Sequence, residues 1–285
     1  MNLQGLSTAM VLGACVLAIP NTGYAYNYSM DDFNITRNGT LIFDDSFTDG
    51  LPPPSAPDFA NGASTGYGTL GTFGPEMGGK LTIDSAGAAA SVNPGGPLLQ
   101  NFAVVQQPMN PTSPNGMGVG TTFDVQGVFD LVVPVLTPGV VATGYGIELN
   151  DCVAGVCGND VLVVQLVRRP NNSLVVNFVR NDFLANTQTV YATIALGAVD
   201  LLHQQIGFDL IKASASVNQI QADYFFVDGG IKSGLTPIAA TTDIFQGEDF
   251  TRGSLFGFER TVPEPATLVL LSLGLAGLGF SRRKQ

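Results

Sequence analysis

The chain has 285 residues, of which 45% are hydrophobic and only 12% are charged, and its formal net charge is −11. Charged residues make up about 25% of a typical globular protein, so much of this polar surface must consist of Ser, Thr, Asn, Gln and backbone groups. The acidic balance argues against a nucleic acid partner, because phosphate binding requires clustered Lys and Arg. The 35 Gly and 17 Pro favour many turns over long helices.

Residues 1–25 have the organisation of a secretory signal peptide. An apolar stretch over residues 9–19, the predicted signal helix, is followed by the small residues Gly23 and Ala25, whose alternate spacing signal peptidase requires. We therefore expect signal peptidase to cleave after Ala25. A lipoprotein signal ending at Cys15 is an alternative, although cleavage there would leave an apolar mature N-terminus.

From residue 26 to residue 262 the sequence predicts one all-β domain. Apolar runs of strand length recur between turn signals, and many alternate with a period of two, as in residues 220–226. These runs lie too close together for crossover helices, which favours a single antiparallel β-sandwich of roughly ten to fourteen strands, jelly-roll-like in topology, over an immunoglobulin-like sandwich. The predicted strands are 41–47, 79–84, 118–125, 144–149, 160–167, 173–179, 189–196, 205–211 and 218–230.

The segments between these strands differ in composition. Residues 168–172, "RRPNN", predict the turn of a hairpin. Residues 195–205 fit either a short helix or a loop. The segments 51–79 and 86–118 are rich in Gly, Pro, Ser and Asn, and we expect long ordered loops there.

Two cysteines lie close together in "DCVAGVC", at Cys152 and Cys157. In an oxidising compartment this spacing predicts a disulfide that closes a small loop. A metal site is the weaker alternative, because no second Cys pair lies nearby and the only His of the chain is His203.

The chain ends in Pro263-Glu264-Pro265, an apolar run over residues 266–280 and a basic tail over residues 282–284. A helix that spans a membrane usually needs about 20 apolar residues, so this run predicts a short hydrophobic helix and a marginal anchor. The basic tail would stay cytoplasmic by the positive-inside rule.

This ending resembles the PEP-CTERM sorting signal of Gram-negative bacteria. The Pro-Glu-Pro tripeptide, the glycine-containing apolar run and the pair Arg282-Arg283 agree with it in order and at the very end of the chain. The resemblance assigns residues 263–285 to a sorting signal, recognised in the inner membrane by an exosortase that removes the tail. It also implies a final place at the cell surface or outside the cell, in the setting of exopolysaccharide or biofilm formation.

Three short stretches of the central region resemble concanavalin-A-like jelly rolls of the laminin-G and pentraxin type. They are "FDDSFTDG" from Phe43, "GYGIEL" from Gly144 and "IQADYFFVDG" from Ile220. A likeness of this kind bears on the fold and does not assign a function.

The sequence contains no catalytic constellation that we recognise. It has no Gly-x-Ser-x-Gly elbow, and His203 has no evident nucleophile to activate. Glu148 and Asp151 are the only pair comparable to the carboxylates of a glycosidase, and residues three apart on a strand face opposite sides. We therefore expect a protein that is not an enzyme.

Two kinds of binding site stay open. Calcium is the metal that best suits the acidic residues of the chain, because carboxylates are its preferred ligands. The candidate ligands are Asp44, Asp45 and Asp49 early in the chain and Asp228 late in it. Resemblance to laminin-type jelly rolls, in which the first and last strands are neighbours, implies that these clusters meet. The alternative is turn chemistry, in which Asp bonds to its own backbone.

The second kind of site is a sugar-binding surface. The chain has no Trp to stack on a sugar ring, so Tyr67 and Tyr145 are the aromatic candidates. The alternative for Tyr145 is a core position with its hydroxyl at the edge.

These observations predict an exported, non-enzymatic protein that is sorted by an exosortase and is structural or associated with matrix polysaccharide. Two alternatives remain at this point: a calcium-dependent lectin-like module, and an envelope protein whose tail is never removed from the membrane.

Overall fold

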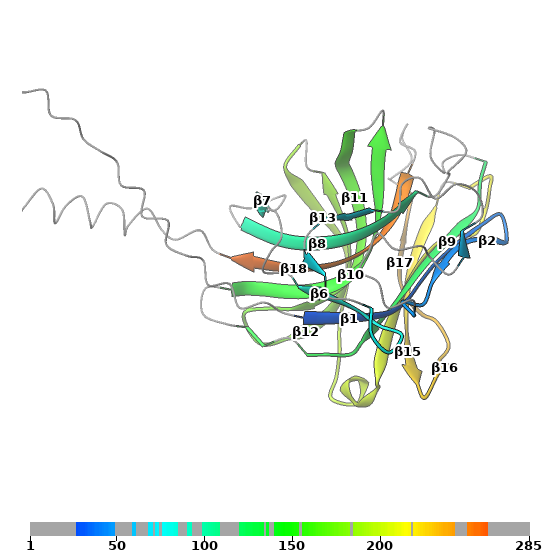
Figure 1. The fold of residues 1–285 in the computed structure, drawn as a ribbon. Helices are drawn as coiled ribbons and strands as arrows, with labels where there is room; N and C mark the ends of the chain where they lie inside the picture. The colour runs from blue at the N-terminus through cyan, green and yellow to red at the C-terminus, as the bar shows by residue number, and fades with distance from the viewer. Residues whose placement is uncertain are drawn as a thin grey trace, which may run out of the picture.

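Two antiparallel β-sheets make up nearly all of the described structure, a computed structural model, and they pack face to face as a sandwich (Figure 1). The predicted all-β sandwich is therefore confirmed. The short 3-10 helix η2 (Asp200–Leu202) is the only helix among the described residues. Those residues are 27–48, 59–60, 68–70, 72–73, 76–84, 90–92, 99–108, 120–133, 135–136, 140–153, 156–182, 185–217, 219–242 and 250–261.

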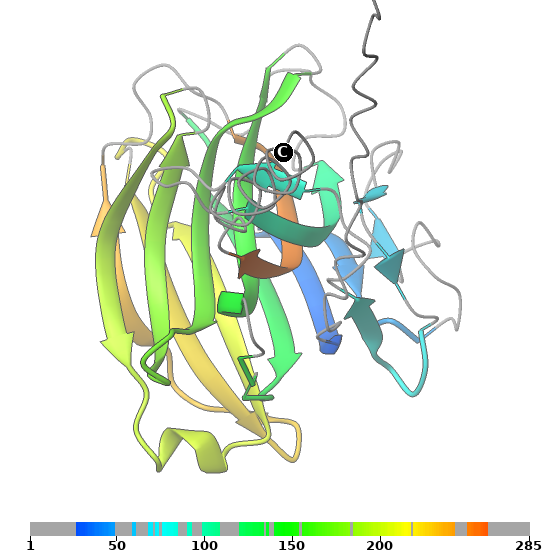
Figure 2. The ribbon, with the colours of Figure 1, turned by 90° about the vertical axis from the view of Figure 1, so that its left-hand side faces the viewer.

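Sheet A contains ten strands and sheet B contains eight (Figure 2). The order in sheet A is β16 (Ile231–Lys232), β15 (Ile220–Asp228), β14 (Gln205–Lys212), β9 (Phe123–Asp130), β1 (Asn27–Arg37), β2 (Thr40–Asp45) and β3 (Phe59–Ala60). Beside this path, β17 (Thr236–Thr241) pairs with β15, and β6 (Leu81–Asp84) pairs with β1 and β5 (Thr72–Phe73).

The order in sheet B is β13 (Thr187–Ala195), β12 (Leu174–Asp182), β11 (Val156–Arg168), β10 (Val140–Val153), β18 (Phe250–Thr261), β8 (Leu99–Pro108) and β4 (Gly68–Leu70). β7 (Ala90–Val92) also pairs with β8. Consecutive strands from β10 to β13 form a meander, so the sheet is built largely from hairpins.

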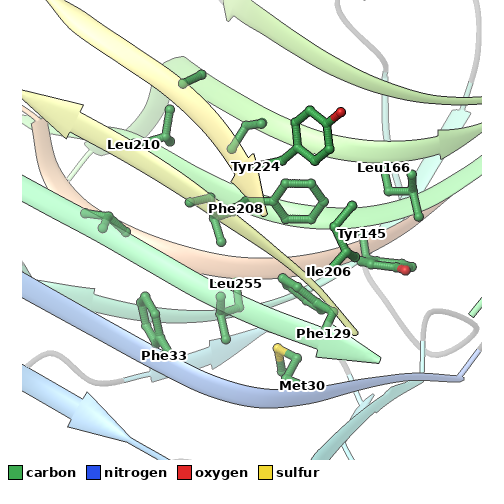
Figure 3. Packing of buried hydrophobic residues seen from close by; sticks show 14 of the residues in the cluster. Met30, Phe33, Phe129, Tyr145, Leu166, Ile206, Phe208, Leu210, Tyr224 and Leu255 are labelled. Atoms are coloured by element: carbon green, nitrogen blue, oxygen red, sulfur yellow. The ribbon is translucent and has the colours of Figure 1, made fainter. Parts of the chain in front are cut away.

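Alternating side chains explain why these segments form half-buried strands. On β9, Phe123, Val125 and Phe129 are at most 2% exposed and face the interior, whereas Asp124 and Gln126 face outward. The interior side chains of both sheets pack into one continuous hydrophobic core (Figure 3).

Aromatic rings connect the two sheets at the centre of this core. The ring of Phe129 on β9 lies 5.0 Å from that of Tyr145 on β10 and 5.9 Å from that of Phe208 on β14. Offset and tilted pairs at these distances add stabilisation beyond the area that they bury.

The predicted hairpin turn over residues 168–172 is confirmed. Arg169 N donates a hydrogen bond to Ser173 O at 3.0 Å, and Asn172 adopts a φ of 64°, which Asn tolerates better than most residues. Residues 195–205 form a connection that contains only the one-turn η2.

Two of the sequence-based expectations about chain organisation are wrong. The segment 86–118 contains β8, a ten-residue strand, and the segment 51–79 contains β3, β4 and β5, so neither is only a loop. Strand β8 pairs with β18 over ten register positions, and these ladder hydrogen bonds do not depend on a strongly apolar composition.

Strands β1 and β18 were not predicted either. β1 belongs to sheet A and β18 to sheet B, so these first and last strands are not ladder neighbours, in contrast to the arrangement implied by laminin-type jelly rolls.

Among the described residues there is no helix with the length and apolar character needed to cross a membrane. The predicted signal helix and the predicted C-terminal hydrophobic helix lie outside the described residues.

Candidate functional site

The acidic residues predicted as calcium ligands do not converge. Asp44 and Asp45 end β2, whereas Asp228 ends β15, and β14, β9 and β1 lie between these two strands. Four strand spacings correspond to roughly 19 Å, while calcium ligands lie about 2.4 Å from the ion. Asp49 lies outside the described residues. No group of three or more His, Cys, Asp or Glu in the described part of the chain could hold a metal ion.

The carboxylate of Asp45 takes part in a turn. Its Oδ1 accepts a hydrogen bond from Phe47 N at 3.0 Å, two residues further on, and Phe47 has a φ of 52°. This is the turn chemistry in which Asp bonds to nearby backbone, and it stabilises the positive φ that follows β2.

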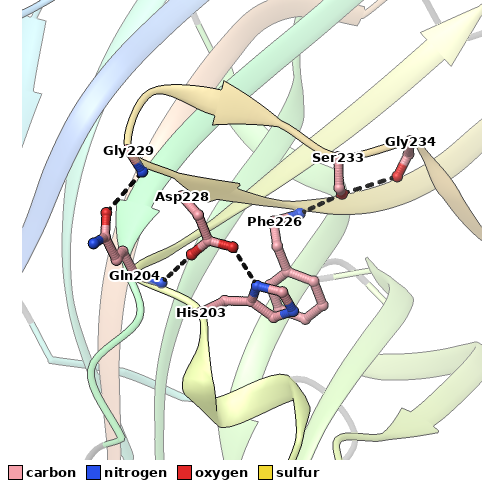
Figure 4. A network of polar contacts seen from close by, with 7 residues as sticks. All are labelled: His203, Gln204, Phe226, Asp228, Gly229, Ser233 and Gly234. Atoms are coloured by element: carbon pink, nitrogen blue, oxygen red, sulfur yellow. Dashed lines mark hydrogen bonds and ion pairs between the residues drawn. The ribbon is translucent and has the colours of Figure 1, made fainter.

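Asp228 belongs to a polar network at one end of the sandwich (Figure 4). Its Oδ2 lies 2.6 Å from His203 Nδ1, and its Oδ1 accepts a hydrogen bond from Gln204 N at 2.9 Å. The hydrogen bond from His203, followed by that from Gln204, lowers the pKa of Asp228. The imidazole also stacks on Phe226, with ring centroids 4.1 Å apart. The network joins the residues just before β14 to the end of β15.

Tyr145 is a core residue and offers no sugar-binding surface. Its side chain is 0% exposed, and its hydroxyl donates a hydrogen bond to Asp130 O at 3.1 Å. Burial raises the pKa of this hydroxyl. Tyr67 lies outside the described residues, as do the predicted cleavage position Ala25 and the predicted sorting residues Pro263, Glu264, Pro265, Arg282 and Arg283.

The side of sheet B that faces away from the main core carries apolar and uncharged polar side chains, most of which are buried. We call it the outer face, and it consists of the side chains that alternate with the core residues along β18, β10, β11, β12 and β13. Part of it is a second apolar cluster that is separate from the main core, formed by Ala142, Val161, Val163, Val167, Val175, Val179, Phe256 and Phe258.

Rows of uncharged polar side chains cross the outer face between these apolar residues. Along one row, cross-strand pairing places Gln165 beside Asn177 and Asn177 beside Thr193. Along a second row, Asn181 pairs with Gln188, whose Nε2 donates a hydrogen bond to Asn181 Oδ1 at 2.7 Å. These rows lie on strands that belong to one hairpin series, so their spacing is fixed by the ladder.

Arg169, in the turn between β11 and β12, reaches the first row with its guanidinium group. Its Nη2 donates hydrogen bonds to Asn177 Oδ1 at 3.3 Å and to Thr193 Oγ1 at 3.4 Å. Thr193 Oγ1 also donates to Asn177 Oδ1 at 3.0 Å. Thr193 is exposed, whereas Asn177 and Gln165 are only 8% and 2% exposed, so the Thr193 end of this row is the part open to a ligand rich in hydroxyls.

Two glycines keep the ladder of β10 close to that of β11. A Cβ added at Gly144 would lie 2.0 Å from Leu166 O, and one added at Gly146 would lie 2.1 Å from Val164 O. Both contacts are with backbone and cannot be relieved by a rotamer change. The rings of Phe258 and Phe256 lie beside these glycines in the register.

Glu148 is the acidic residue of the outer face on β10. Burial raises its pKa to about 7, although Asn150 and Ser254 oppose the shift by hydrogen bonding to it. Asn150 Nδ2 donates to Glu148 Oε1 at 2.7 Å and to Ser254 Oγ at 2.8 Å. The carboxyl group is thus held in a hydrogen-bonded cluster of uncharged neighbours.

The backbone places Cys152 directly opposite Cys157 in the β10–β11 ladder. Residues opposite one another in an antiparallel ladder have Cα atoms about 4.5–5.5 Å apart, which is within the usual range for disulfides. The predicted disulfide is compatible with this register and stays a prediction.

Sequence reasoning did not identify the outer face as a candidate site. Its polar members are single Asn, Gln and Thr residues inside strands that read as apolar runs, and only the register shows that they form rows. The alternation of Gln165 and Asn177 with valines was the available signal.

The chain carries a PEP-CTERM protein-sorting motif, which matches residues 261–284. The resemblance seen in the sequence is therefore confirmed, and the motif follows directly on β18. It supports a protein that is exported and sorted by an exosortase.

Comparison with solved structures finds a likeness to the CBM2 module of the evolved Dit of Lactobacillus casei BL23 phage J-1. The two chains share 11% identity with a TM-score of 0.41, over 81% of this chain and 89% of the other. A likeness this remote carries no argument about function. No curated protein matches the chain in sequence.

Proposed function

We propose that this protein is a non-enzymatic surface or extracellular component that associates with matrix polysaccharide through the outer face of sheet B. The observation that carries the exported, sorted part of this proposal is the motif at residues 261–284. On this proposal the chain passes the inner membrane, is held there by its tail and is then processed by an exosortase.

The exposed end of the first polar row, at Thr193 on β13, supports the polysaccharide part. Sugars present many hydroxyl groups, and uncharged amide and hydroxyl side chains can both donate to and accept from them. Arg169, Asn177 and Thr193 form such a group, and Val190, on the same strand as Thr193, is 52% exposed. Polar groups at fixed positions among apolar side chains are typical of small-molecule and sugar sites.

Sorting is tested by the intact mass of the protein in a Gram-negative host with and without its exosortase. We expect a product that begins near Tyr26 and ends close to Pro263 only when the exosortase is present. A product that runs to Gln285 in the membrane fraction under both conditions would show that the tail is a permanent anchor.

Polysaccharide association is tested by co-sedimentation of the exported protein with the exopolysaccharide of the producing strain. Replacing Asn177 and Thr193 by Ala should weaken binding by roughly tenfold, the effect of two lost hydrogen bonds at about 0.5–1.5 kcal/mol each. The matched control is Asn34→Ala, which removes an amide from the outward side of sheet A. Equal loss in both variants would contradict a site on sheet B.

The non-enzymatic part is tested separately. The protein should leave the polysaccharide chain length unchanged after prolonged incubation. Depolymerisation that disappears in Glu148→Gln would contradict this part and would make the buried carboxyl group catalytic.

A further inference from the structure

We infer that β13 is a docking edge for a second copy of this chain, and that two copies pair through it in an antiparallel manner about a twofold axis. This inference concerns the edge of sheet B and does not depend on polysaccharide binding by its outer face.

β13 is an edge strand of nine residues. It pairs with β12 on one side, and no other described strand pairs with it on the other. The outward backbone N–H and C=O groups of such an edge form a template for another strand. Pairing with an identical strand in the antiparallel direction satisfies both sets of groups equally, as a twofold interface requires.

The sequence of β13 has few of the features that protect an edge from pairing. "TQTVYATIA" contains no charged residue, no proline and no glycine. Its one irregularity is a register shift opposite Phe178 and Val179, where Tyr191 is the extra residue. Thr, Val, Tyr and Ile all favour extended structure.

The neighbouring edge of sheet A, unlike β13, is protected from pairing with another strand. There the edge strand β17 has only six residues and contains Pro237, and the two-residue β16 carries Lys232. Proline, short length and lysine are the usual means of blocking an edge. One side of the sandwich thus combines a blocked edge strand with an open one.

Exposed apolar side chains accompany the open edge. Val190 on β13 is 52% exposed, and Val199 and Leu202, in the connection that follows β13, are 73% and 81% exposed. In an antiparallel pair this connection lies beside the first residues of the partner's β13, so these side chains would lose contact with water.

Charge favours β13 over other surfaces of the protein as the place where two copies meet. The chain has a net charge of −11, so most surfaces of two copies repel each other. β13 itself is uncharged and avoids this repulsion. Pairing would also extend the rows of the outer face from one copy into the next, since Thr193 and Gln188 lie on β13.

The first test places a lysine on the edge. In the full chain purified in detergent, Val190→Lys should raise the dimer dissociation constant, measured by sedimentation, by at least about tenfold, because a lysine on an edge strand blocks pairing with another strand in any register. The matched control is Val217→Lys, at a residue of similar exposure (49%) in the connection between β14 and β15. It should leave the dimer intact.

The second test maps the register in cells. Single cysteines introduced one at a time from Gln188 to Ile194 in the exported full chain should give a disulfide-linked dimer at one or two adjacent positions, where the twofold axis crosses the strand. A protein that stays monomeric at the highest concentrations reached, or a dimer that tolerates Val190→Lys and crosslinks at no β13 position, would overturn the inference. Thermal unfolding of each variant separates loss of pairing from loss of folding.

Discussion

The carboxyl group of Asp209 on β14 lies within hydrogen-bonding reach of the carboxyl group of Asp124 on β9, on the outward side of sheet A. Asp209 is 1% exposed, and Gln126 Nε2 donates to its Oδ2 at 3.3 Å. Burial, followed by the neighbouring Asp124, raises the pKa of Asp209 to about 9, whereas nearby Lys232 opposes the shift. The carboxyl group of Asp209 therefore keeps its proton at neutral pH.

Stability should fall as the pH rises from about 4 to about 9. Asp209, Glu148 and Asp32 have folded-state pKa values raised to about 9, 7 and 6, mainly by burial. A raised folded-state pKa means that the folded protein binds more protons than the unfolded chain, so the stabilisation is complete below the unfolded pKa and is lost as pH rises through the folded pKa.

Thermal unfolding across this pH range checks the prediction. We expect the Tm at pH 9 to be lower than that at pH 5 by at least about 4 °C, the shift that 1–2 kcal/mol produces in a domain of this size. Asp209→Asn should reduce the dependence, and Asp200→Asn should leave it unchanged. A Tm that rises with pH would contradict the assignment of these protonated groups.

Glu148→Gln should stabilise the fold at alkaline pH only. The amide keeps an oxygen that can accept the hydrogen bond from Asn150, and it cannot acquire the buried negative charge that is costly above a pKa of about 7. The Tm of the variant should match that of the wild type at pH 5 and exceed it at pH 9. An equal decrease at both pH values would mean that the carboxyl group is needed for packing.

Gly146→Ala should destabilise the sandwich severely. The new Cβ would lie 2.1 Å from the carbonyl oxygen of Val164, so the β10–β11 ladder would have to separate locally. Overpacking of this kind costs about 1–3 kcal/mol, measurable by urea unfolding. Gly234→Ala is the matched control, since no atom lies within 4 Å of its added Cβ. Similar midpoints for both variants would show that the ladder adjusts freely.

The exported protein should contain no free thiol at Cys152 and Cys157. Alkylation under denaturing conditions, followed by mass spectrometry, should add no label before reduction and two labels after it. Replacing both residues by Ser should lower the free energy of unfolding by about 2 kcal/mol, because the closed loop is short. Two labels before reduction would show that the ladder pairs these residues without a covalent bond.

Much of the strand pattern could be predicted because it depends on local alternation. Residues 205–211 and 220–226 alternate with a period of two, and they form the adjacent strands β14 and β15 of sheet A. Strands β1, β8 and β18 escaped prediction. On β8, for example, the polar residues Asn101 and Gln106 interrupt the apolar pattern. The formation of these strands depends on partner strands far away in the sequence, as with β8 and β18.

The site predictions failed where they depended on contacts between residues that are distant in the sequence. Asp44 and Asp228 were placed together by analogy with another jelly roll, and the observed strand order separates them. Tyr145 could not be assigned to surface or core from its own neighbours, and packing against Phe129 decides that it is buried.

By itself the sequence determined the sorting motif at residues 261–284 and the all-β class. The motif is an ordered run of contiguous residues, and the all-β class follows from the alternation of apolar and polar residues within short segments. Only the tertiary structure decided which faces and edges the protein presents. The rows from Gln165 to Thr193, and the side of β13 that pairs with no other strand in the described part of the chain, exist because the strands are held in a defined order and register. That order is set by packing of the whole core, which no local stretch of residues specifies.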